Sequence, residues 1–475
     1  MKDKVLILGL IILAVGVSIF GLGKASFNQD ELALLHHQSL SFSVIIDICR
    51  DHLFHPPLFY FFLKIWVFFS GLDELAARSS SIPWFVLTAL LPVLHKRKFG
   101  FHAWIFSIML ISSFPILYYA RQVSPYSMAL FFTTFAIILS IDSSLEWKKL
   151  GLLGALAFLT HYLAGVFYFT TLATFLLSSL VTKSKESIRF FLKSMGLTSL
   201  LILPWIMYCR VFQKMPIGKD LYFWNPARNQ MRQLESVVIH LFSDSYWLLG
   251  FCLAIFLVAI IIKRFKVQPF VVSTLAILAI FIGGLYLRSL QYNSVLIPRY
   301  FIWLVPLIYM ALLSVTIPRT VWFALGFLLV QTTGSISYIH NWQDVRAAFK
   351  DMEIVSSKSN CTVQPYLLAF NHNWFNPYLP PGNELTECNL RFFKHEICNE
   401  ESMPAKFLLE HPEPFMIAFI PSECSSFLSL GMMRPEVGRL ASYAFYKVYY
   451  QGVKEQEMRS EDYLDFLMEK GFGQK

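Results

Sequence analysis

The sequence predicts an all-α polytopic membrane protein with about eleven transmembrane helices and a small external α/β domain at its C-terminal end. The 475-residue chain is 56% hydrophobic and 16% aromatic but only 15% charged, whereas soluble domains are about a quarter charged. Its apolar residues form long runs separated by basic clusters, which is typical of repeated membrane crossing. This composition excludes an ordinary soluble enzyme. We attribute the net charge of +9 to cytoplasmic loops, and we expect no nucleic-acid partner.

The first apolar run, residues 5–22, follows Lys2 and Lys4 and has no cleavage site of small residues near Lys24. We therefore predict an uncleaved first span with the N-terminus in the cytoplasm. Four later basic clusters set the topology if all of them are cytoplasmic: 96–98, 148–149, 183–189 and 263–266.

The first external loop is predicted to be long, covering residues 24–77. An odd number of crossings must return the chain to the cytoplasm, yet two apolar stretches are present, 57–72 and 82–94. The first is short, begins at a Pro-Pro pair and carries Lys64 at its centre. We therefore predict an interfacial helix over 57–72 and a span over 82–94.

Residues 150–181 lie between two cytoplasmic clusters, so they must cross twice or not at all. Their length predicts two short spans with an external turn near Thr160 and His161. The other predicted spans are 101–119, 126–141, 190–208, 246–262, 270–287, 301–317 and 321–339. Residues 1–339 are thus predicted to form the transmembrane domain, and the C-terminus is predicted to be outside.

Residues 340–475 have a mixed composition typical of one soluble domain. Apolar periodicity predicts helices over 341–354 and 461–470, and strands over 363–370, 415–420 and 441–450. The domain contains four cysteines, Cys361, Cys388, Cys398 and Cys424. In an oxidising compartment they could form two disulfides, and the alternative is buried free thiols.

Ionisable residues near a membrane are costly unless they are used, so those on the predicted outer side are candidate site residues. Asp30 and Glu31 follow the first span. One carboxylate could act as a general base while the other pairs with a cation, because adjacent residues on a helix diverge by about 100°. The alternative is an acidic pair at the start of a helix.

Basic residues from remote loops are predicted to reach the same side. Arg121 and Arg299 could each hold a phosphate, or each could be an arginine anchored at the interface. His161 could carry a proton, donate to a phosphate or be a satisfied core histidine. His55 precedes two prolines that stiffen its loop. No glycine-rich phosphate loop, zinc-hydrolase motif or serine-hydrolase elbow is present.

These residues occur in a recognisable order along the chain. The segments are Asp30-Glu31, His55-Pro-Pro-Leu-Phe-Tyr-Phe, Glu74-Leu-Ala-Ala-Arg78-Ser, Ala120-Arg121 to Pro125-Tyr126, Thr160-His161-Tyr162, Pro298-Arg299-Tyr300-Phe301 and Asn341-Trp342-Gln343-Asp344-Val345. Up to about residue 350, the chain resembles the bacterial protein mannosyltransferase-like (family 39-type) and aminoarabinose-transferase-like membrane glycosyltransferases. No single segment is specific, and the resemblance depends on their order.

The resemblance implies a C-type glycosyltransferase fold in the bacterial cytoplasmic membrane. It implies an inverting enzyme that moves a sugar from a polyprenyl phosphate to an acceptor hydroxyl, of a protein, lipid or glycan, on the outer face. Asp30 would be the general base and Glu31 its partner. The donor phosphate would be bound by His55, Arg121, Tyr126, His161, Arg299 and Tyr300.

No cofactor is implied by the resemblance, and the spacing of Asp30, Glu31 and the histidines makes a poor set of ligands for a divalent metal. The alternative function is a transporter or flippase of a lipid-linked saccharide. A transporter should carry its ionisable residues on broken helices at the bilayer midplane, related by an internal repeat. No such repeat is found in the sequence.

Overall fold

The computed structural model divides into two compact units, which we describe separately: Met1–Leu22, Gln38–Gly71 and Leu75–Ser337 form the first, and Gly23–His37, Leu72–Glu74 and Tyr338–Lys475 the second. The structure describes residues 2–23, 27, 29–52, 55–100, 102–141, 146–209, 230–242, 246, 249–250, 253, 269–291 and 296–315. It also describes the backbone of seven short strands between residues 364 and 451.

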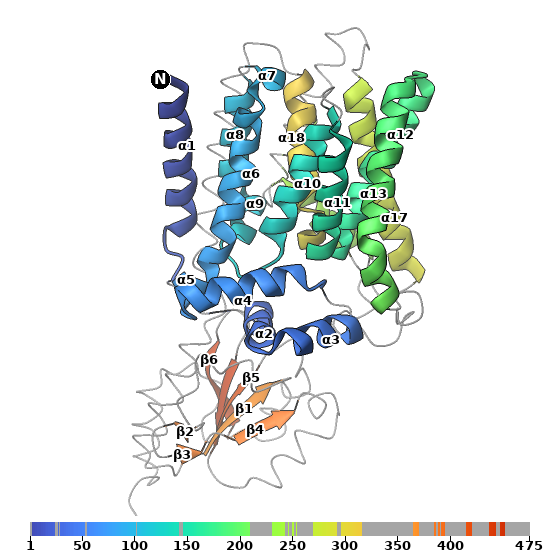
Figure 1. Ribbon diagram of the computed structural model, residues 1–475. Helices are drawn as coiled ribbons and strands as arrows, with labels where there is room; N and C mark the ends of the chain where they lie inside the picture. Colours follow the sequence, from blue (N-terminus) through green and yellow to red (C-terminus); the bar gives the residue numbers. More distant parts are fainter. Residues whose placement is uncertain are drawn as a thin grey trace, which may run out of the picture. The chain divides into compact units, whose positions relative to one another are not determined.

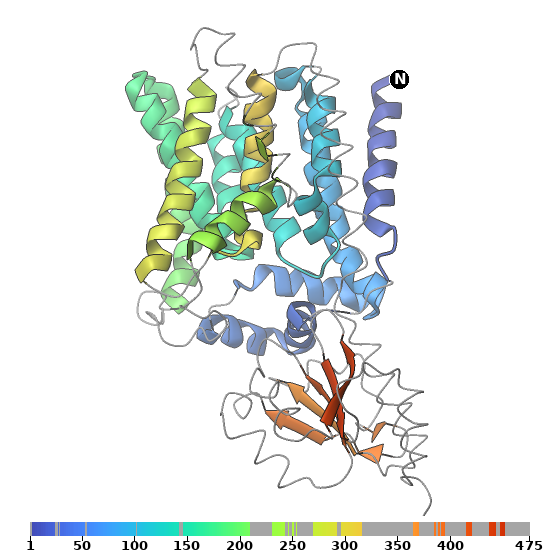
Figure 2. The same ribbon diagram turned by 180° about the vertical axis from the view of Figure 1, so that it is seen from behind.

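The first unit is helical. Its helices are α1 (Lys2–Ile19), α3 (Phe42–His52), α4 (Leu58–Ser70), α6 (Ile82–Leu94), α7 (Lys96–Phe99), α8 (His102–Ser112), α9 (Phe114–Ala120), α10 (Tyr126–Ile141), α11 (Trp147–Thr160), α12 (Tyr162–Val181), α13 (Lys185–Cys209), α15 (Gln230–Leu241), α17 (Pro269–Gln291) and α18 (Leu304–Val315). The short segments α5 (Glu74–Arg78) and η1 (Ser79–Ser81) lead into α6, and the 3-10 helix η2 (Pro298–Phe301) precedes α18. Figures 1 and 2 show the long helices side by side, with α3 and α4 running crosswise at one end.

The long helices have the length and surface of membrane helices. Among the described residues, four helices are long and apolar enough to cross a bilayer, or five if the bent pair α8 and α9 is counted as one span. Large apolar side chains on these helices are exposed, including Val181 at 83% and Met207 at 70%. An exposed apolar surface of this kind indicates a membrane protein.

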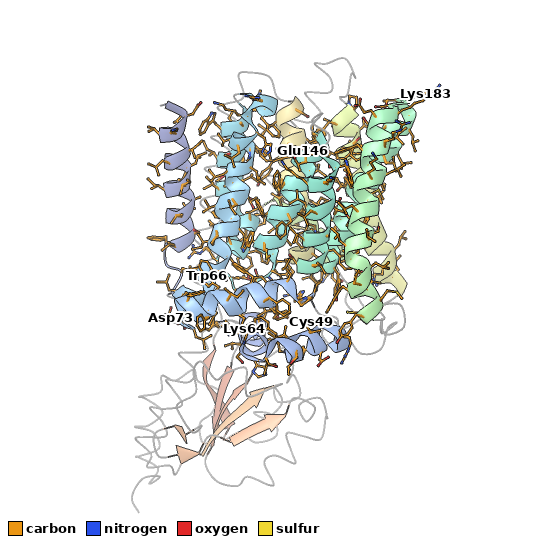
Figure 3. All side chains as sticks on the ribbon, in the orientation of Figure 1. Cys49, Lys64, Trp66, Asp73, Glu146 and Lys183 are labelled. Atoms are coloured by element: carbon orange, nitrogen blue, oxygen red, sulfur yellow. The ribbon has the colours of Figure 1, made fainter. Side chains whose placement is uncertain are left out.

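Three of the predicted basic clusters are brought to one end of the helices. The N-terminus of α1 and the short α7 lie at this end in Figure 1, and Lys183 lies there in Figure 3. An ion pair between Lys96 of α7 and Asp3 of α1 joins two of these segments directly. Their common position agrees with the topology predicted from the sequence, and the cytoplasmic orientation of this end stays a prediction.

Helix α4 covers most of the predicted interfacial segment. It has 13 residues, too few to span a bilayer as a straight helix. Nζ of Lys64 donates to the backbone carbonyls of Gln38 at 3.0 Å and Leu40 at 2.8 Å. These carbonyls lie at or just past the end of α2 (Gln29–Ser39), where a helix dipole favours a cation. The charge of Lys64, which makes residues 57–72 a poor span, is therefore hydrogen-bonded to backbone oxygens.

The predicted turn near His161 is confirmed, since α11 ends at Thr160 and α12 begins at Tyr162. The helices pack closely through Gly154, where an added Cβ would lie 2.3 Å from the Tyr168 ring and 2.7 Å from Oγ1 of Thr198. The Tyr168 hydroxyl donates to the Leu150 carbonyl at 3.0 Å, and Thr198 donates to Tyr168 at 3.1 Å. Helices α11, α12 and α13 thus form a tight support for the turn.

The structure adds two features that the sequence did not predict. The predicted span over 101–119 is broken, because α8 and α9 meet at Ser113 with a bend of 59°. Pro115 lies in the first turn of α9, where its missing amide and fixed φ suit a helix start rather than a helix interior. Helix α15 was not predicted at all.

The second unit contains the N-terminal part of α2 and a five-stranded mixed sheet of order β4-β1-β5-β7-β6. Its strands are β1 (Gln364–Ala369), β4 (Arg391–Lys394), β5 (Phe415–Phe419), β6 (Val437–Ser442) and β7 (Lys447–Gln451). Strand β1 pairs in parallel with β4 and β5, whereas β7 is antiparallel to β5 and β6. A separate pair joins β2 (Glu384–Leu385) to β3 (Cys388–Asn389).

The predicted strands over 363–370 and 415–420 match β1 and β5. The predicted strand over 441–450 is wrong as a single element, because the chain forms two antiparallel strands, β6 and β7, separated by residues 443–446. The predicted helices over 341–354 and 461–470 lie outside the described residues, as do the span over 321–339, most of that over 246–262 and the cysteine side chains of this region. The count of eleven spans and the domain boundary at residue 340 stay predictions.

Candidate active site

Ends of helices from four parts of the chain meet around His161. Tyr126 begins α10, His55 precedes α4, and Tyr300 and Trp303 lie in or after η2. The centroid of the His161 ring is 5.4 Å from that of Tyr126 and 5.2 Å from that of Trp303. It is 5.0 Å from the ring of His55 and 5.5 Å from the ring of Tyr300. Together with Arg299, these residues form what we call the His161 cluster.

The position of His161 fixes its protonation. It is the N-cap of α12, and its Nδ1 accepts a hydrogen bond from the backbone amide of Leu163 at 3.2 Å. Because an amide only donates, Nδ1 carries no proton and the ring proton lies on Nε2. Burial lowers the pKa of His161 well below its usual value, and the nearby His55 and Arg299 lower it further. His161 is therefore a neutral hydrogen-bond donor at neutral pH.

The most deeply buried residues of the cluster carry ring nitrogens that lack a hydrogen-bond partner among the residues that the structure describes. Nε2 of His161, a residue that is 3% exposed, and Nε1 of Trp303, a residue that is 0% exposed, are both of this kind. A buried donor without an acceptor costs about 1–3 kcal/mol. The cluster therefore contains donors that its own side chains do not satisfy.

Arg299 adds a permanent positive charge to the cluster. Its guanidinium carbon lies 5.5 Å from the centre of the Tyr300 ring, a cation–π distance. Arg299, Tyr300 and His55 are half-buried, whereas Tyr126, His161 and Trp303 are buried. The inner part of the cluster is thus buried and its outer part is partly exposed. The charge of Arg299 favours an anion.

Asp30 and Glu31 lie in the first turn of α2, in the part of the chain that belongs to the second unit. Asp30 is exposed and Glu31 is 1% exposed. The two neighbouring carboxylates therefore have different surroundings, as expected for adjacent residues of a helix. Both also lie where a helix dipole favours negative charge.

Arg121 lies at the end of α1. Its Nη2 donates to the carbonyl of Phe20 at 2.6 Å, and Nη1 of the buried Arg78 donates to the carbonyl of Leu22 at 3.0 Å. Burial lowers the pKa of Arg121, and the nearby Arg78 lowers it further. The two arginines thus bind backbone oxygens at the end of a helix, where cations are favoured.

Sequence reasoning missed Trp303 and His240. Trp303 lies in an apolar run and resembles an ordinary core aromatic, so no local signal marks it. His240 lies on α15, and its ring centroid is 6.0 Å from that of Phe114 and 6.1 Å from that of Tyr119. In the described part of the chain, no group of three or more His, Cys, Asp or Glu side chains is arranged to hold a metal ion.

The apolar helices, the crosswise α3 and α4, and a cluster of basic and aromatic residues at helix ends define the class: a polytopic membrane protein with a candidate site for an anionic ligand. Its fold is that of the aminoarabinose transferase ArnT. The crystal structure of ArnT from Cupriavidus metallidurans in the apo state is 12% identical to this chain, with a TM-score of 0.58, over 95% of this chain and 98% of that one.

The crystal structure of the same protein bound to undecaprenyl phosphate has a TM-score of 0.56 and 12% identity, covering 93% of this chain and 97% of that one. No family model matches the chain, and no curated protein sequence matches it. The resemblance inferred from the order of short motifs is therefore confirmed at the level of the fold.

Proposed function

We propose that the protein is an inverting glycosyltransferase that uses a polyprenyl-phosphate sugar on the outer face of the bacterial cytoplasmic membrane. The observation that carries this proposal is the His161 cluster, in which buried donors and the charge of Arg299 meet at helix ends. The fold supports the proposal, since an ArnT structure of this fold is bound to undecaprenyl phosphate. Donor class, reaction and membrane side are all parts of the proposal.

In the proposed reaction, Asp30 takes the proton of an acceptor hydroxyl. The acceptor oxygen then forms a bond to the anomeric carbon of the sugar, and the bond from that carbon to the phosphate oxygen breaks. The phosphate oxygen keeps the electron pair, so the lipid phosphate gains a negative charge as it leaves. Donors fixed around that charge lower the barrier because they bind the transition state more strongly than the ground state.

We assign the phosphate to the His161 cluster, with Arg299 as its charged ligand and His55, Tyr126 and Tyr300 around it. The exposed Asp30 is the base, and the buried Glu31 is its electrostatic partner. Arg121 receives a structural role in this proposal because its guanidinium is hydrogen-bonded to the end of α1.

The direct test supplies purified protein with a panel of undecaprenyl-phosphate sugars and candidate acceptors, and measures released undecaprenyl phosphate. Release that depends on an acceptor is expected for a transferase. If no undecaprenyl phosphate is released, but liposomes containing the protein move the intact lipid-linked sugar across the bilayer, the flippase alternative replaces the proposal.

Asp30→Asn should abolish transfer while leaving the protein folded, since Asn has similar size but cannot accept the proton. Asp47→Asn is the matched control: Asp47 forms an exposed ion pair with Arg50 at 2.9 Å, and such pairs contribute about 0–1 kcal/mol. Full transfer by Asp30→Asn would remove Asp30 as the base.

A further inference from the structure

Trp303 is the buried residue of the His161 cluster for which the sequence resemblance assigns no role. Its side chain is 0% exposed, and its ring lies 5.2 Å from His161 and 6.2 Å from Tyr126, centroid to centroid. Indole nitrogen can only donate a hydrogen bond. Within the described residues it has no acceptor.

His161 has the same unmet requirement. Its Nδ1 is occupied by the amide of Leu163, so its remaining capacity is one donor at Nε2, which also has no acceptor in the part of the chain described. Two neighbouring rings thus each offer one N–H, and neither can accept a bond from the other through these atoms. Each needs an acceptor that the described residues do not supply, and one group with several acceptor atoms could satisfy both.

The surroundings favour an anion over a neutral acceptor. Arg299 is close enough to His161 to lower its pKa, so a positive charge lies beside the two donors. A phosphate has several acceptor oxygens, and hydrogen bonds to a charged acceptor are about twice as strong as neutral ones.

Trp84 provides an internal comparison. Its Nε1 is also buried without a hydrogen-bond partner in the described structure. However, the rings around it are those of Phe62 at 5.3 Å, Phe131 at 5.7 Å and Phe132 at 5.5 Å. An indole N–H among aromatic faces makes weak contacts with them. Trp303 differs because a second donor and a cation share its site.

We propose that Nε1–H of Trp303 and Nε2–H of His161 donate to one and the same phosphate group, the leaving phosphate of the lipid donor. This inference rests on the proposed function for the identity of the ligand. Both donors are neutral and fixed by the fold, Trp303 by complete burial and His161 by its role as N-cap. They therefore strengthen their bonds as the departing phosphate gains charge, without a proton transfer.

The test measures how tightly purified protein in detergent binds radiolabelled undecaprenyl phosphate. Trp303→Phe removes the N–H and keeps an aromatic ring. His161→Asn removes the Nε2 donor and keeps a side chain that caps helices well. Trp84→Phe is the matched control, because it removes the same group from a site whose ring contacts are to phenylalanines. Circular dichroism and thermal unfolding monitor the fold of each variant.

We expect Trp303→Phe and His161→Asn each to weaken binding about tenfold or more, the value of one lost hydrogen bond to a charged group. Trp84→Phe should bind as the wild type does, and unlabelled undecaprenol, which lacks the phosphate, should not compete. In the transfer assay, Trp303→Phe should lower kcat as well, since its bond strengthens in the transition state.

Wild-type affinity in folded Trp303→Phe would overturn the inference and leave the proposed function standing. Competition by undecaprenol equal to that by undecaprenyl phosphate would also overturn it, because the tail alone would then be recognised. If the folded wild type binds no undecaprenyl phosphate, the proposed function itself fails, and the inference fails with it.

Discussion

Two groups of basic and donor residues, the His161 cluster and the end of α1, differ in what their donors contact. At the end of α1, Arg121 and Arg78 donate to the carbonyls of Phe20 and Leu22. In the His161 cluster, Nε2 of His161 and Nε1 of Trp303 have no acceptor among the described residues. The comparison teaches that an arginine at a helix end is not by itself a ligand site. What distinguishes a candidate site is donor capacity that the fold leaves unused.

The largest effect is expected for Arg299→Ala. Loss of the charged ligand should lower kcat/KM for the lipid donor by about 10²–10³-fold, the usual effect of removing one preorganised group that stabilises a developing anion. Steady-state kinetics at varied donor concentration measures it. An unchanged kcat/KM would contradict the proposed difference between the His161 cluster and the end of α1.

Arg121→Ala should act mainly on stability. It removes a hydrogen bond from a charged donor to a helix carbonyl, so the free energy of unfolding should fall by about 1–2 kcal/mol. Affinity for undecaprenyl phosphate should stay within about twofold of the wild type. Thermal unfolding and lipid binding are measured on the same sample. A large loss of lipid affinity in a stable Arg121→Ala protein would assign the phosphate to the end of α1 instead.

The smallest effect is expected from pH. The pKa of His161 is lowered in the folded protein, so below its unfolded value of about 6.5 the unfolded chain binds a proton that the native chain does not. The contribution of His161 to the free energy of unfolding should therefore be fully present above pH 6.5. It should decrease as the pH falls below 6.5, by up to about 1.4 kcal/mol per pH unit.

His161→Asn should remove the pH-dependent loss of stability that is due to His161. The neighbouring His55, Tyr126, Arg299 and Tyr300 are the same in both proteins. The measurement is the shift of the unfolding temperature between pH 7.5 and 5.5 in each protein. An equal shift in both would show that folding does not lower the pKa of His161.

Much of the helical structure follows from local sequence. Helices α6 and α10 have the bounds predicted for residues 82–94 and 126–141, and the break at His161 lies where span length required it. Local reasoning failed where a local signal was overlooked, as at Pro115, or where two short strands looked like one, as in β6 and β7.

The candidate site was predicted less completely than the helices. His55, Tyr126, His161, Arg299 and Tyr300 were all chosen from the sequence, and the structure brings them together. Trp303 could not be chosen, because one tryptophan in an apolar run looks like any other. Arg121 and Arg299 could not be distinguished, because both are arginines next to apolar segments.

By itself, then, the sequence determined the membrane class, most helix positions and the residue types available for chemistry, because these depend on the length and charge of continuous segments. Only the tertiary structure decided which helix ends meet around His161, which arginine binds the end of α1, and which buried donors are left without an acceptor. The physical reason is that hydrogen-bond satisfaction depends on packing between residues far apart in the chain, which no local pattern encodes.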